Sequence, residues 1–523
     1  MSINKIIDEF IDFRDGKTDS IPISEIIGFD LKIYRNSINA IGDNLFFIGK
    51  SDSFKGLYIL SEFGKRNSAF DAFRGEEKVY SDIVLKECPL NHQNAIIMRE
   101  LFEFTNPGIV GVKNSFGFGD RLGIAGPGHV RAAKKSSFIP IFAQQSIREL
   151  TRTERTPDEV MDAATWAVFQ EGYKGLWGAD ADHLKTTDDI DYMVKSGFLM
   201  ITIDPGDYVV NEADNLDLET LKARINEVNW EILGDDNENF ISRYSDKSVR
   251  IKNIVNFQID KGKVLRTIVK YGNVIAHTIK MVSYLEKRYG LDKFEIELSI
   301  DETESPTDII DHYIVVNELK RRGIKLTSLA PRFVGDFEKG IDYKGSIDDF
   351  IKQYRMHQTI ARTFGPYKIS FHSGSDKFTI YREVGKIKDG FVHIKTAGTS
   401  YLEALRVIAD VDKELFKAIL EFSIDLYDTE KKTYHVSVDL VNVKRIVSSI
   451  GNDKYSVLLN DDNVRQVLHV CFGRVLTQKD SVGKYLFKEK LMSILQNNED
   501  LYNQCLEAHF ERHLKPFGDG SGG

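Results

Sequence analysis

The sequence predicts an α/β protein built on a TIM-type (β/α) barrel, with a small β-rich N-terminal module, a helical insertion and C-terminal helices. From about residue 111, apolar segments alternate with amphipathic helical segments, which is typical of parallel βα units. Seven such strands can be recognised, and none carries the glycine turn of a dinucleotide-binding sheet. The 523 residues exceed the roughly 250 that a barrel commonly takes, which leaves room for additions.

The N-terminal module is predicted over residues 1–105, where runs such as LFFIG and GLYIL alternate with turn-forming Gly, Asn and Asp. The barrel is predicted over residues 106–445. Its strands are expected in the segments GVKNSFGFGD, GLWGADADH, FLMITIDPG, FEIELSIDE, IKLTSLAPRF, YKISFHSG and FVHIKTAGTS. The segment YHVSVDL, residues 434–440, is the candidate for the eighth strand.

Helical segments separate these strands. They are expected at residues 144–152, 157–170, 190–195, 306–320 and 347–363. An acid-rich helical insertion is expected at about residues 210–290. Residues 446–517 are predicted to form a C-terminal helical region on or over the barrel, and residues 518–523 a flexible tail.

Composition narrows the classes of function. With 70 basic and 79 acidic residues, the net charge of -9 argues against nucleic-acid binding, which depends on clustered Lys and Arg. No apolar run approaches the roughly 20 residues that span a membrane. The three cysteines show no Cys-x-x-Cys spacing, so neither a disulfide framework nor a thiolate zinc site is expected. A cytoplasmic location fits this composition.

The glycine-rich stretch GFGDRLGIAGPGH, residues 117–129, does not fit a phosphate-binding loop. The third glycine of a dinucleotide fingerprint would fall on Leu122, and the stretch ends in His129 and Val130 rather than Lys and Ser/Thr. We expect its glycines to bring the backbone close to a ligand, so that Asp120 and Arg121 face it. The alternative is that this pair stabilises the turn by bonding to neighbouring loops.

Polar residues follow five of the predicted strands, and in a (β/α) barrel the active site lies at the C-terminal ends of the strands. These residues are Asp120 and Arg121, the run from Asp180 to Lys185, Asp301 and Glu302, the run from His372 to Lys377, and His393 with Lys395. Their repetition predicts an active site at this end of the barrel.

His183, Glu302 and His372 are the predicted ligands of a divalent metal. Two imidazoles and one carboxylate suit Zn, Mn, Co, Ni or Fe(II), and they leave positions open for substrate oxygens. Alternatively, the histidines cap helices or belong to the core, and Glu302 favours the N-terminus of the following helix. Asp182, beside His183, is placed to move a proton on a bound substrate. This Asp-His step resembles the corresponding element of class II, metal-dependent aldolases.

Longer motifs carry a resemblance that extends over nearly the whole chain. The segments SFGFGDRLGIAGPGHVRA, GADADHLKT, IDET, FHSGSDKF and RQVLHVCFG are similar to those of the tagaturonate/fructuronate epimerase family. The resemblance implies a metal-dependent enzyme of hexuronate breakdown that inverts one hydroxyl-bearing carbon of a keto-uronate. Relatives are also associated with the neutral ketohexoses tagatose and fructose.

The inverted carbon, C4, is two bonds from the carbonyl carbon, and its hydrogen is therefore not acidic. Retro-aldol cleavage, rotation of the aldehyde and aldol closure would achieve the inversion, with Asp182 as the base and Asp120 or Asp180 serving the opposite face. The substrate carboxylate requires cations, and the candidates are Arg121, Lys185, Lys377 and Lys395. Ser373 and His393 are the remaining predicted substrate contacts.

Three other hypotheses remain open at this stage. Lys395, on an apolar strand, could form a Schiff base with the ketose and make the metal unnecessary. The enzyme could be a ketose isomerase, or an aldolase that releases its fragments. A sugar-acid binding protein without turnover is the hypothesis from another class. The sequence allows an oligomer and does not choose the metal or the preference between a uronate and a neutral ketose.

Overall fold

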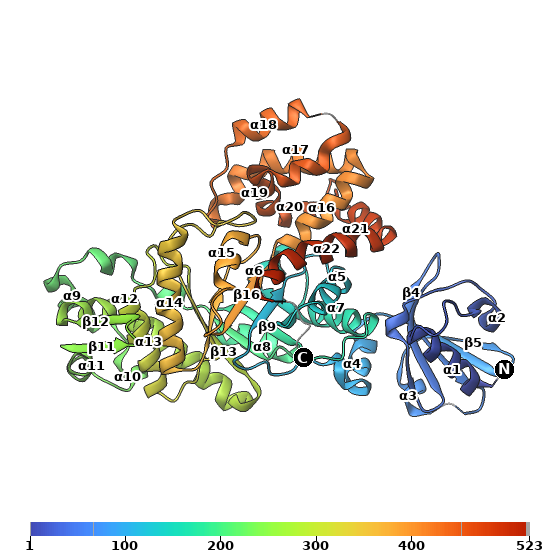
Figure 1. The fold of residues 1–523 in the computed structure, drawn as a ribbon, viewed down its shortest axis with the longest axis horizontal. Helices are drawn as coiled ribbons and strands as arrows, with labels where there is room; N and C mark the ends of the chain where they lie inside the picture. The colour runs from blue at the N-terminus through green and yellow to red at the C-terminus, as the bar shows by residue number, and fades with distance from the viewer. Residues whose placement is uncertain (1, 66, 451, 519–523) are drawn as a thin grey trace.

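The computed structural model describes residues 2–65, 67–450 and 452–518. Its centre is a closed barrel of eight parallel strands, in the order β10-β13-β14-β15-β16-β7-β8-β9. An N-terminal module lies on one side of the barrel, a helical insertion on the opposite side, and the C-terminal helices cover a third side (Figure 1). The predicted fold class is therefore confirmed.

The barrel strands are short, and their helices pack around them. The strands are β7 (Ser115–Phe118), β8 (Ile139–Ser146), β9 (Gly178–Leu184), β10 (Met200–Ile203), β13 (Glu295–Ile300), β14 (Ser328–Pro331), β15 (Lys368–Phe371) and β16 (Val392–Thr396). The helices that follow them are α5 (Gly126–Ala133), α6 (Ile147–Thr153), α7 (Pro157–Gln170), α8 (Thr187–Lys195), α13 (Ile309–Arg321), α14 (Ile347–Phe364), α15 (Phe378–Val384) and α16 (Thr399–Val411).

The predicted position of the eighth strand is wrong. The eighth strand is β8, which pairs with β7 and β9, whereas residues 435–439 have no regular structure and lead into α18 (Leu440–Ser449). The expected helix at 144–152 also begins later than predicted. Residues 144–146 complete β8, and the Ser146 side chain accepts a hydrogen bond from the backbone N–H of Glu149, so that the helix begins directly after the strand.

The N-terminal module is an antiparallel sheet with small helices. Its elements are α1 (Ile3–Arg14), α2 (Ile23–Ile27), β1 (Lys32–Ile33), β2 (Asn39–Ile41), β3 (Asn44–Lys50), β4 (Lys55–Glu62), α3 (Ser68–Ala72), β5 (Glu76–Tyr80), β6 (Ile83–Pro89) and α4 (His92–Leu101). Phe46 and Phe102 of this part belong to one buried cluster with Trp166 and Phe169 of α7. The module is therefore packed directly against the barrel.

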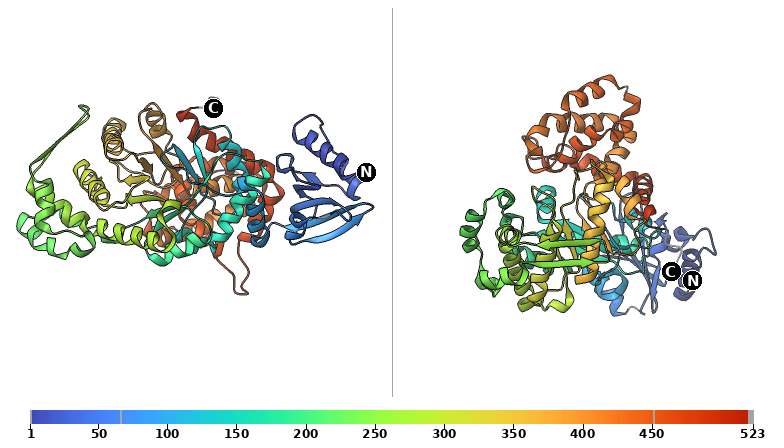
Figure 2. Two further views of the ribbon diagram at one scale, coloured as in Figure 1. Left: turned by 90° about the horizontal axis from the view of Figure 1, so that it is seen from below. Right: turned by 60° about the vertical axis from the view of Figure 1, so that its left-hand side comes forward.

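The insertion follows β10 and contains more than helices. It comprises α9 (Leu218–Arg224), α10 (Trp230–Leu233), α11 (Asn237–Tyr244), the hairpin of β11 (Lys247–Ile251) and β12 (Val255–Ile259), and the long helix α12 (Lys261–Tyr289). The hairpin interrupts the helical stretch that the sequence predicts. The N-terminal module and the insertion lie at opposite ends of the molecule (Figure 2).

The C-terminal helices pack beside the barrel and on one another. They are α17 (Lys413–Glu430), α18, α19 (Asp462–Val470), α20 (Phe472–Thr477), α21 (Lys488–Asn497) and α22 (Glu499–Leu514). Of the predicted tail, all but Gly518 lies outside the described residues. No helix in the described part of the chain is long and apolar enough to cross a bilayer.

Candidate active site

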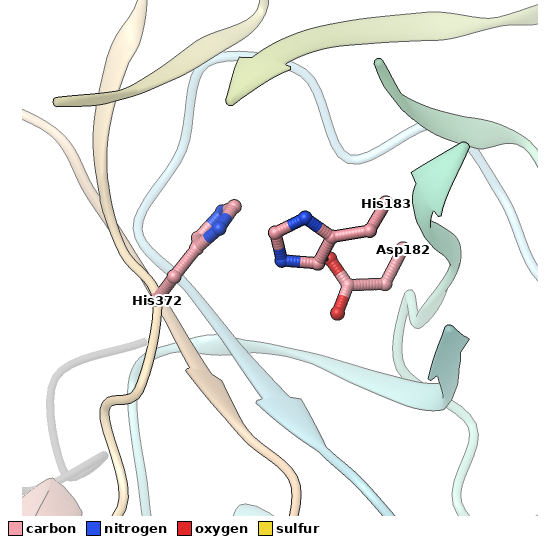
Figure 3. Close-up of side chains that lie close together, drawn as sticks. All are labelled: Asp182, His183 and His372. Atoms are coloured by element: carbon pink, nitrogen blue, oxygen red, sulfur yellow. The ribbon is translucent and has the colours of Figure 1, made fainter. Parts of the chain in front are cut away.

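Three predicted residues meet at the C-terminal end of the barrel. Asp182 and His183 lie at the end of β9, and His372 follows β15 (Figure 3). Each offers one ligand atom, and these atoms all lie within 4.8 Å of one another. The two imidazole rings are 4.9 Å apart between centroids. This arrangement fits a small cation held by two nitrogens and an oxygen.

The backbone of His183 explains how two adjacent residues face the same space. Side chains of a regular strand alternate between its two faces, so neighbours normally point apart. His183 has φ of 53°, in the left-handed region, and the pairing of β9 with β10 shifts register at this level. Ser373 and Asp376, after β15, also have positive φ. Such strained positions are common at functional sites.

Lys395 lies beneath this group and connects three strands. Its Nζ is 2.7 Å from Asp180 Oδ2, 2.7 Å from Asp182 Oδ1 and 2.7 Å from Glu297 Oε1. All four side chains are buried. Burial opposes the charge of Lys395, but Asp180 and Asp182 outweigh it and hold the pKa of the ammonium well above its usual range.

The two aspartates of β9 differ in their protonation. Burial and the charge of Asp182 raise the pKa of Asp180 to about 6, although Lys395 opposes the shift. Burial would also raise the pKa of Asp182, but the charges of His183 and Lys395 prevail and lower it below the usual range. Asp182 is therefore charged at neutral pH, whereas Asp180 takes up a proton at about pH 6.

His372 lies between two carboxylates, neither of which was predicted as a metal ligand. Its Nε2 is 2.8 Å from Glu297 Oε1, and its Nδ1 is 3.1 Å from Asp301 Oδ1. Burial disfavours the imidazolium, but the charge of Asp301 prevails, and the pKa of His372 is raised to about 10. His183 Nδ1 lies 3.4 Å from Asp204 Oδ2. Carboxylates beside both rings can fix their orientation toward a cation.

A cleft extends from this group to the surface through two adjoining cavities. Both are lined by Arg148, His183, Lys339, His372, Ser373 and Tyr434. The inner cavity also includes Arg121, Asp182 and Lys395. Within it, the Arg121 guanidinium pairs with Glu149 at 3.0 Å and stacks on the ring of Phe472. The structure thus brings these six predicted residues to the inner cavity: Arg121, Asp182, His183, His372, Ser373 and Lys395.

Glu302 lies at the edge of this cleft rather than within the close group. It lines the outer cavity together with His183 and His372, but its side chain is 47% exposed and its nearest cationic partner is Arg148 at 3.9 Å. The neighbouring carboxylate of Asp301 contacts His372 instead. The structure therefore brings the two predicted imidazoles together with Asp182 and Asp301 more closely than with Glu302.

Asp120 is turned toward the backbone of its own loop. Its carboxylate accepts hydrogen bonds from the N–H groups of Leu122, Gly123 and Ala125, at 2.8 to 2.9 Å. Gly123, with φ of 78°, allows the tight turn that brings these donors together. Asp120 is absent from the lining of both cavities. This is the turn-forming alternative that the sequence left open.

The other predicted residues also lie outside the two cavities. Lys185 pairs with Asp207 at 2.8 Å, and both side chains are exposed. Lys377 is buried and donates to the carbonyl oxygens of Glu338, Ile341 and Ser375, so it fastens loops together. His393 is buried inside the barrel, with its Nδ1 2.9 Å from Ser115 Oγ.

Sequence reasoning missed Glu297, Arg148 and Lys339. Glu297 carried a signal, because it lies at an alternate position of the otherwise apolar strand EIELSI and is fully buried. A buried carboxylate requires a charged or hydrogen-bonding partner, and Lys395 and His372 supply them. Arg148 and Lys339 carried no signal, because their place in the cleft depends on loop positions.

Comparison with known proteins identifies the family of this chain. A family model described as tagaturonate epimerase matches residues 34–517. The chain belongs to this family. A curated member, the tagaturonate/fructuronate epimerase of Thermotoga maritima, is 41% identical over 487 residues, which cover 93% of this chain and 97% of that protein. The predicted family resemblance is confirmed.

Solved structures give the same result. The native fructuronate-tagaturonate epimerase of Cohnella laeviribosi aligns with a TM-score of 0.87 and 33% identity, covering 95% of this chain and 98% of that one. Its complex with one glycerol aligns equally well, with a TM-score of 0.87 and 33% identity, over 95% of this chain and 98% of that one. This member of the tagaturonate epimerase family is accordingly a carbohydrate epimerase, an enzyme of the isomerase class.

The protonation of His372 predicts a pH dependence for cation binding. Because its pKa is raised to about 10, the ring is protonated at neutral pH, and a cation must displace that proton. We expect the apparent affinity for Mn²⁺ to rise between about pH 6 and 8, by up to about tenfold per pH unit for each proton displaced. Titrations at several pH values measure the slope.

Asp301→Asn should make that slope shallower, because it removes the largest charge that raises the pKa of His372. Asp207→Asn is the matched control, since Asp207 is exposed and pairs with Lys185 outside the cleft. An affinity for Mn²⁺ that does not change with pH in the unmodified protein would contradict the role of His372.

Proposed function

We propose that this epimerase interconverts tagaturonate and fructuronate by inverting C4 of the ketose, with the help of a divalent metal. The observation that carries the proposal is the group of Asp182, His183 and His372, whose ligand atoms lie within 4.8 Å of one another. This group lies at the barrel end where such enzymes hold their substrates. The names of the relatives supply the substrate pair.

The charges around the group suit a doubly charged cation. Five carboxylates, those of Asp180, Asp182, Asp204, Glu297 and Asp301, surround one ammonium and two imidazoles. Even with both imidazoles protonated, negative charge is in excess when the carboxylates are ionised. His183 Nδ1 is buried and makes no hydrogen bond of normal geometry. These features support a cation site for Zn, Mn, Co, Ni or Fe(II).

We propose His183 and His372 as the ligands, completed by a carboxylate from the Asp301-Glu302 step. When bound, the metal supplies a positive charge that polarises the ketose carbonyl and stabilises negative charge on its oxygen. Asp301 or Glu297 can accept a hydrogen bond from the remaining ring N–H of His372 and hold the imidazole in place.

Inversion at C4 requires a route that does not remove a hydrogen from that carbon. A base takes the C4 hydroxyl proton, and the C3–C4 bond breaks. The electron pair of that bond passes toward the carbonyl, so that one fragment becomes an enediolate and the other an aldehyde. The aldehyde then presents its other face, the C3–C4 bond re-forms, and the new C4 oxygen regains a proton. This retro-aldol and aldol sequence leaves the atoms and charges of the substrate unchanged.

Asp182 is the proposed base for the hydroxyl proton. It lines the inner cavity, and its lowered pKa keeps it charged at neutral pH. Asp180 does not line the cleft but shares the ammonium of Lys395 with Asp182. Its pKa near 6 suits a group that supplies the proton when the new C4 oxygen is reprotonated. Lys395 would relay this proton from Asp180 to the substrate. Asp120 is a weaker candidate, because backbone donors occupy its carboxylate.

The C-terminal helices support confinement of the two fragments. His469 of α19 lines the inner cavity, and Tyr434, in the segment before α18, lines both cavities. A closed cleft would keep the aldehyde beside the enediolate until the bond re-forms.

We also propose the neutral ketohexoses tagatose and fructose as further substrates. The three free cysteines agree with a reducing cytoplasmic location.

We expect metal-loaded enzyme to convert tagaturonate to fructuronate and the reverse, and chelator-stripped enzyme to convert neither. Asp182→Asn should retain the metal and lose at least about 100-fold in kcat, because the hydroxyl proton has no charged acceptor. Product analysis and metal content of the same samples test both statements. Loss of the metal from Asp182→Asn would make Asp182 a ligand instead of the base.

Borohydride added during turnover should not label Lys395. A Schiff base forms from the neutral amine, whereas three carboxylates hold the pKa of Lys395 well above its usual range. Mass spectrometry of the digested protein makes this measurement. A reduced substrate adduct at Lys395, together with full activity in chelator, would favour the Schiff-base hypothesis.

A further inference from the structure

The cleft contains two cations without a close ion-pair partner among the described residues. Arg148 of α6 and Lys339, in the loop after β14, line both of its cavities. Lys339 donates to Ser373 Oγ at 2.5 Å, a neutral partner. Among the described residues, Lys339 has no carboxylate within ion-pair distance. Burial and the neighbouring charge of Arg148 lower the pKa of Lys339.

Arg148 does not have a strong partner either. Its nearest carboxylate is Glu302 at 3.9 Å, and the two side chains are 40% and 47% exposed. An exposed pair at this separation contributes little. The ring of Tyr434 lies 5.8 Å from the guanidinium and limits its movement on one side. Burial disfavours the charge of Arg148, but Glu302 and Glu149 prevail and raise its pKa, so the guanidinium stays charged. Two cations are thus held at one wall of the cleft, and neither is in a close ion pair.

Four other cations are predicted from the sequence as partners of the substrate carboxylate. Unlike Arg148 and Lys339, each of them already has close ion-pair or carbonyl partners within the protein. Arg121 is paired with Glu149, Lys185 with Asp207, and Lys395 with three buried carboxylates. Lys377 is enclosed by carbonyl oxygens. None of the four offers an uncompensated charge to a ligand in the cleft.

We infer that Arg148 and Lys339 form an anion subsite that binds the carboxylate of the substrate. The inference rests on the proposed function and makes it more specific, because it assigns the preference for a uronate over a neutral ketose to these two side chains. A guanidinium can bind a carboxylate through two hydrogen bonds, and an ammonium adds a point charge. His183 and His372 line the same two cavities, so a single sugar chain can reach both groups.

The loop that carries Lys339 is firmly held. Arg465 of α19 donates to the carbonyl of Gly340 at 2.8 Å and pairs with Asp376 at 2.7 Å. Lys377 donates to the carbonyl of Glu338 at 2.8 Å. The ammonium is therefore positioned before a ligand arrives, which reduces the entropy lost on binding.

The test compares Lys339→Met and Arg148→Gln with Lys386→Met. Lys386 is the matched control, because its side chain is 68% exposed and pairs with Glu383 of α15, outside the cleft. Calorimetric titration with gluconate and with the uncharged sorbitol gives a readout that does not require turnover. The ratio of kcat/KM for tagaturonate over tagatose gives a second one.

Gluconate should bind the wild type and Lys386→Met more tightly than sorbitol, and each cleft variant should lose roughly 10- to 100-fold of that preference. The tagaturonate-to-tagatose ratio of kcat/KM should fall by a similar factor, and added salt should weaken gluconate binding. Equal affinities for gluconate and sorbitol in the wild type, or an unchanged preference in both cleft variants, would overturn the subsite.

These outcomes are distinct from failure of the proposed function. A wild-type enzyme that does not convert tagaturonate would refute that function, whatever the gluconate titrations show. A wild-type enzyme that converts tagaturonate, with cleft variants that keep the full ratio of kcat/KM, would refute only the subsite.

Discussion

The arrangement of the proposed site depends on the buried ammonium of Lys395. Moving a charge out of water costs several kcal/mol unless partners of opposite charge surround it. Asp180, Asp182 and Glu297 supply them, each at 2.7 Å, from strands on the other side of the barrel. The strands that carry these four side chains are therefore held in fixed relative positions. One oxygen of Glu297, Oε1, contacts both Lys395 at 2.7 Å and His372 at 2.8 Å, so the network reaches the histidines directly.

The ion pairs around Lys395 give two similar aspartates different pKa values. Asp180 and Asp182 are two positions apart on one strand, so both face the barrel interior. The pKa of Asp180 is raised to about 6, whereas that of Asp182 is lowered, because only Asp182 lies beside the charges of His183 and His372. Two aspartates of different pKa thus lie side by side around one lysine, as the proposed route with its two opposite proton transfers needs.

Much of this arrangement could be predicted from the sequence. The alternation of apolar and helical segments gave seven strands of the barrel, and polar residues at strand ends located His183 and His372. The eighth strand was misplaced because IPIFAQQS runs directly into a helix without a turn signal, whereas YHVSVDL alternates like a strand. Instead, Tyr434 and His435 of that segment line the outer cavity.

Other features could not be predicted because they depend on distant segments. The choice between Asp301 and Glu302 depends on how the chain leaves β13, since a change of one residue reverses the direction of a side chain. The partners of Arg121 and Lys377 come from other loops, so the sequence could not show that their hydrogen-bonding groups are already engaged. For the same reason, Arg148 and Lys339 were overlooked.

The central claim is that His183 and His372 hold one divalent cation above Lys395. Metal analysis of the purified protein and of His183→Ala and His372→Ala tests it most directly, with His92→Ala of the N-terminal module as the control. We predict about one metal ion per chain in the wild type and the control, and loss of the metal in the two cleft variants, by analogy with other two-histidine sites. Full metal content in either cleft variant, with the fold intact, would contradict it.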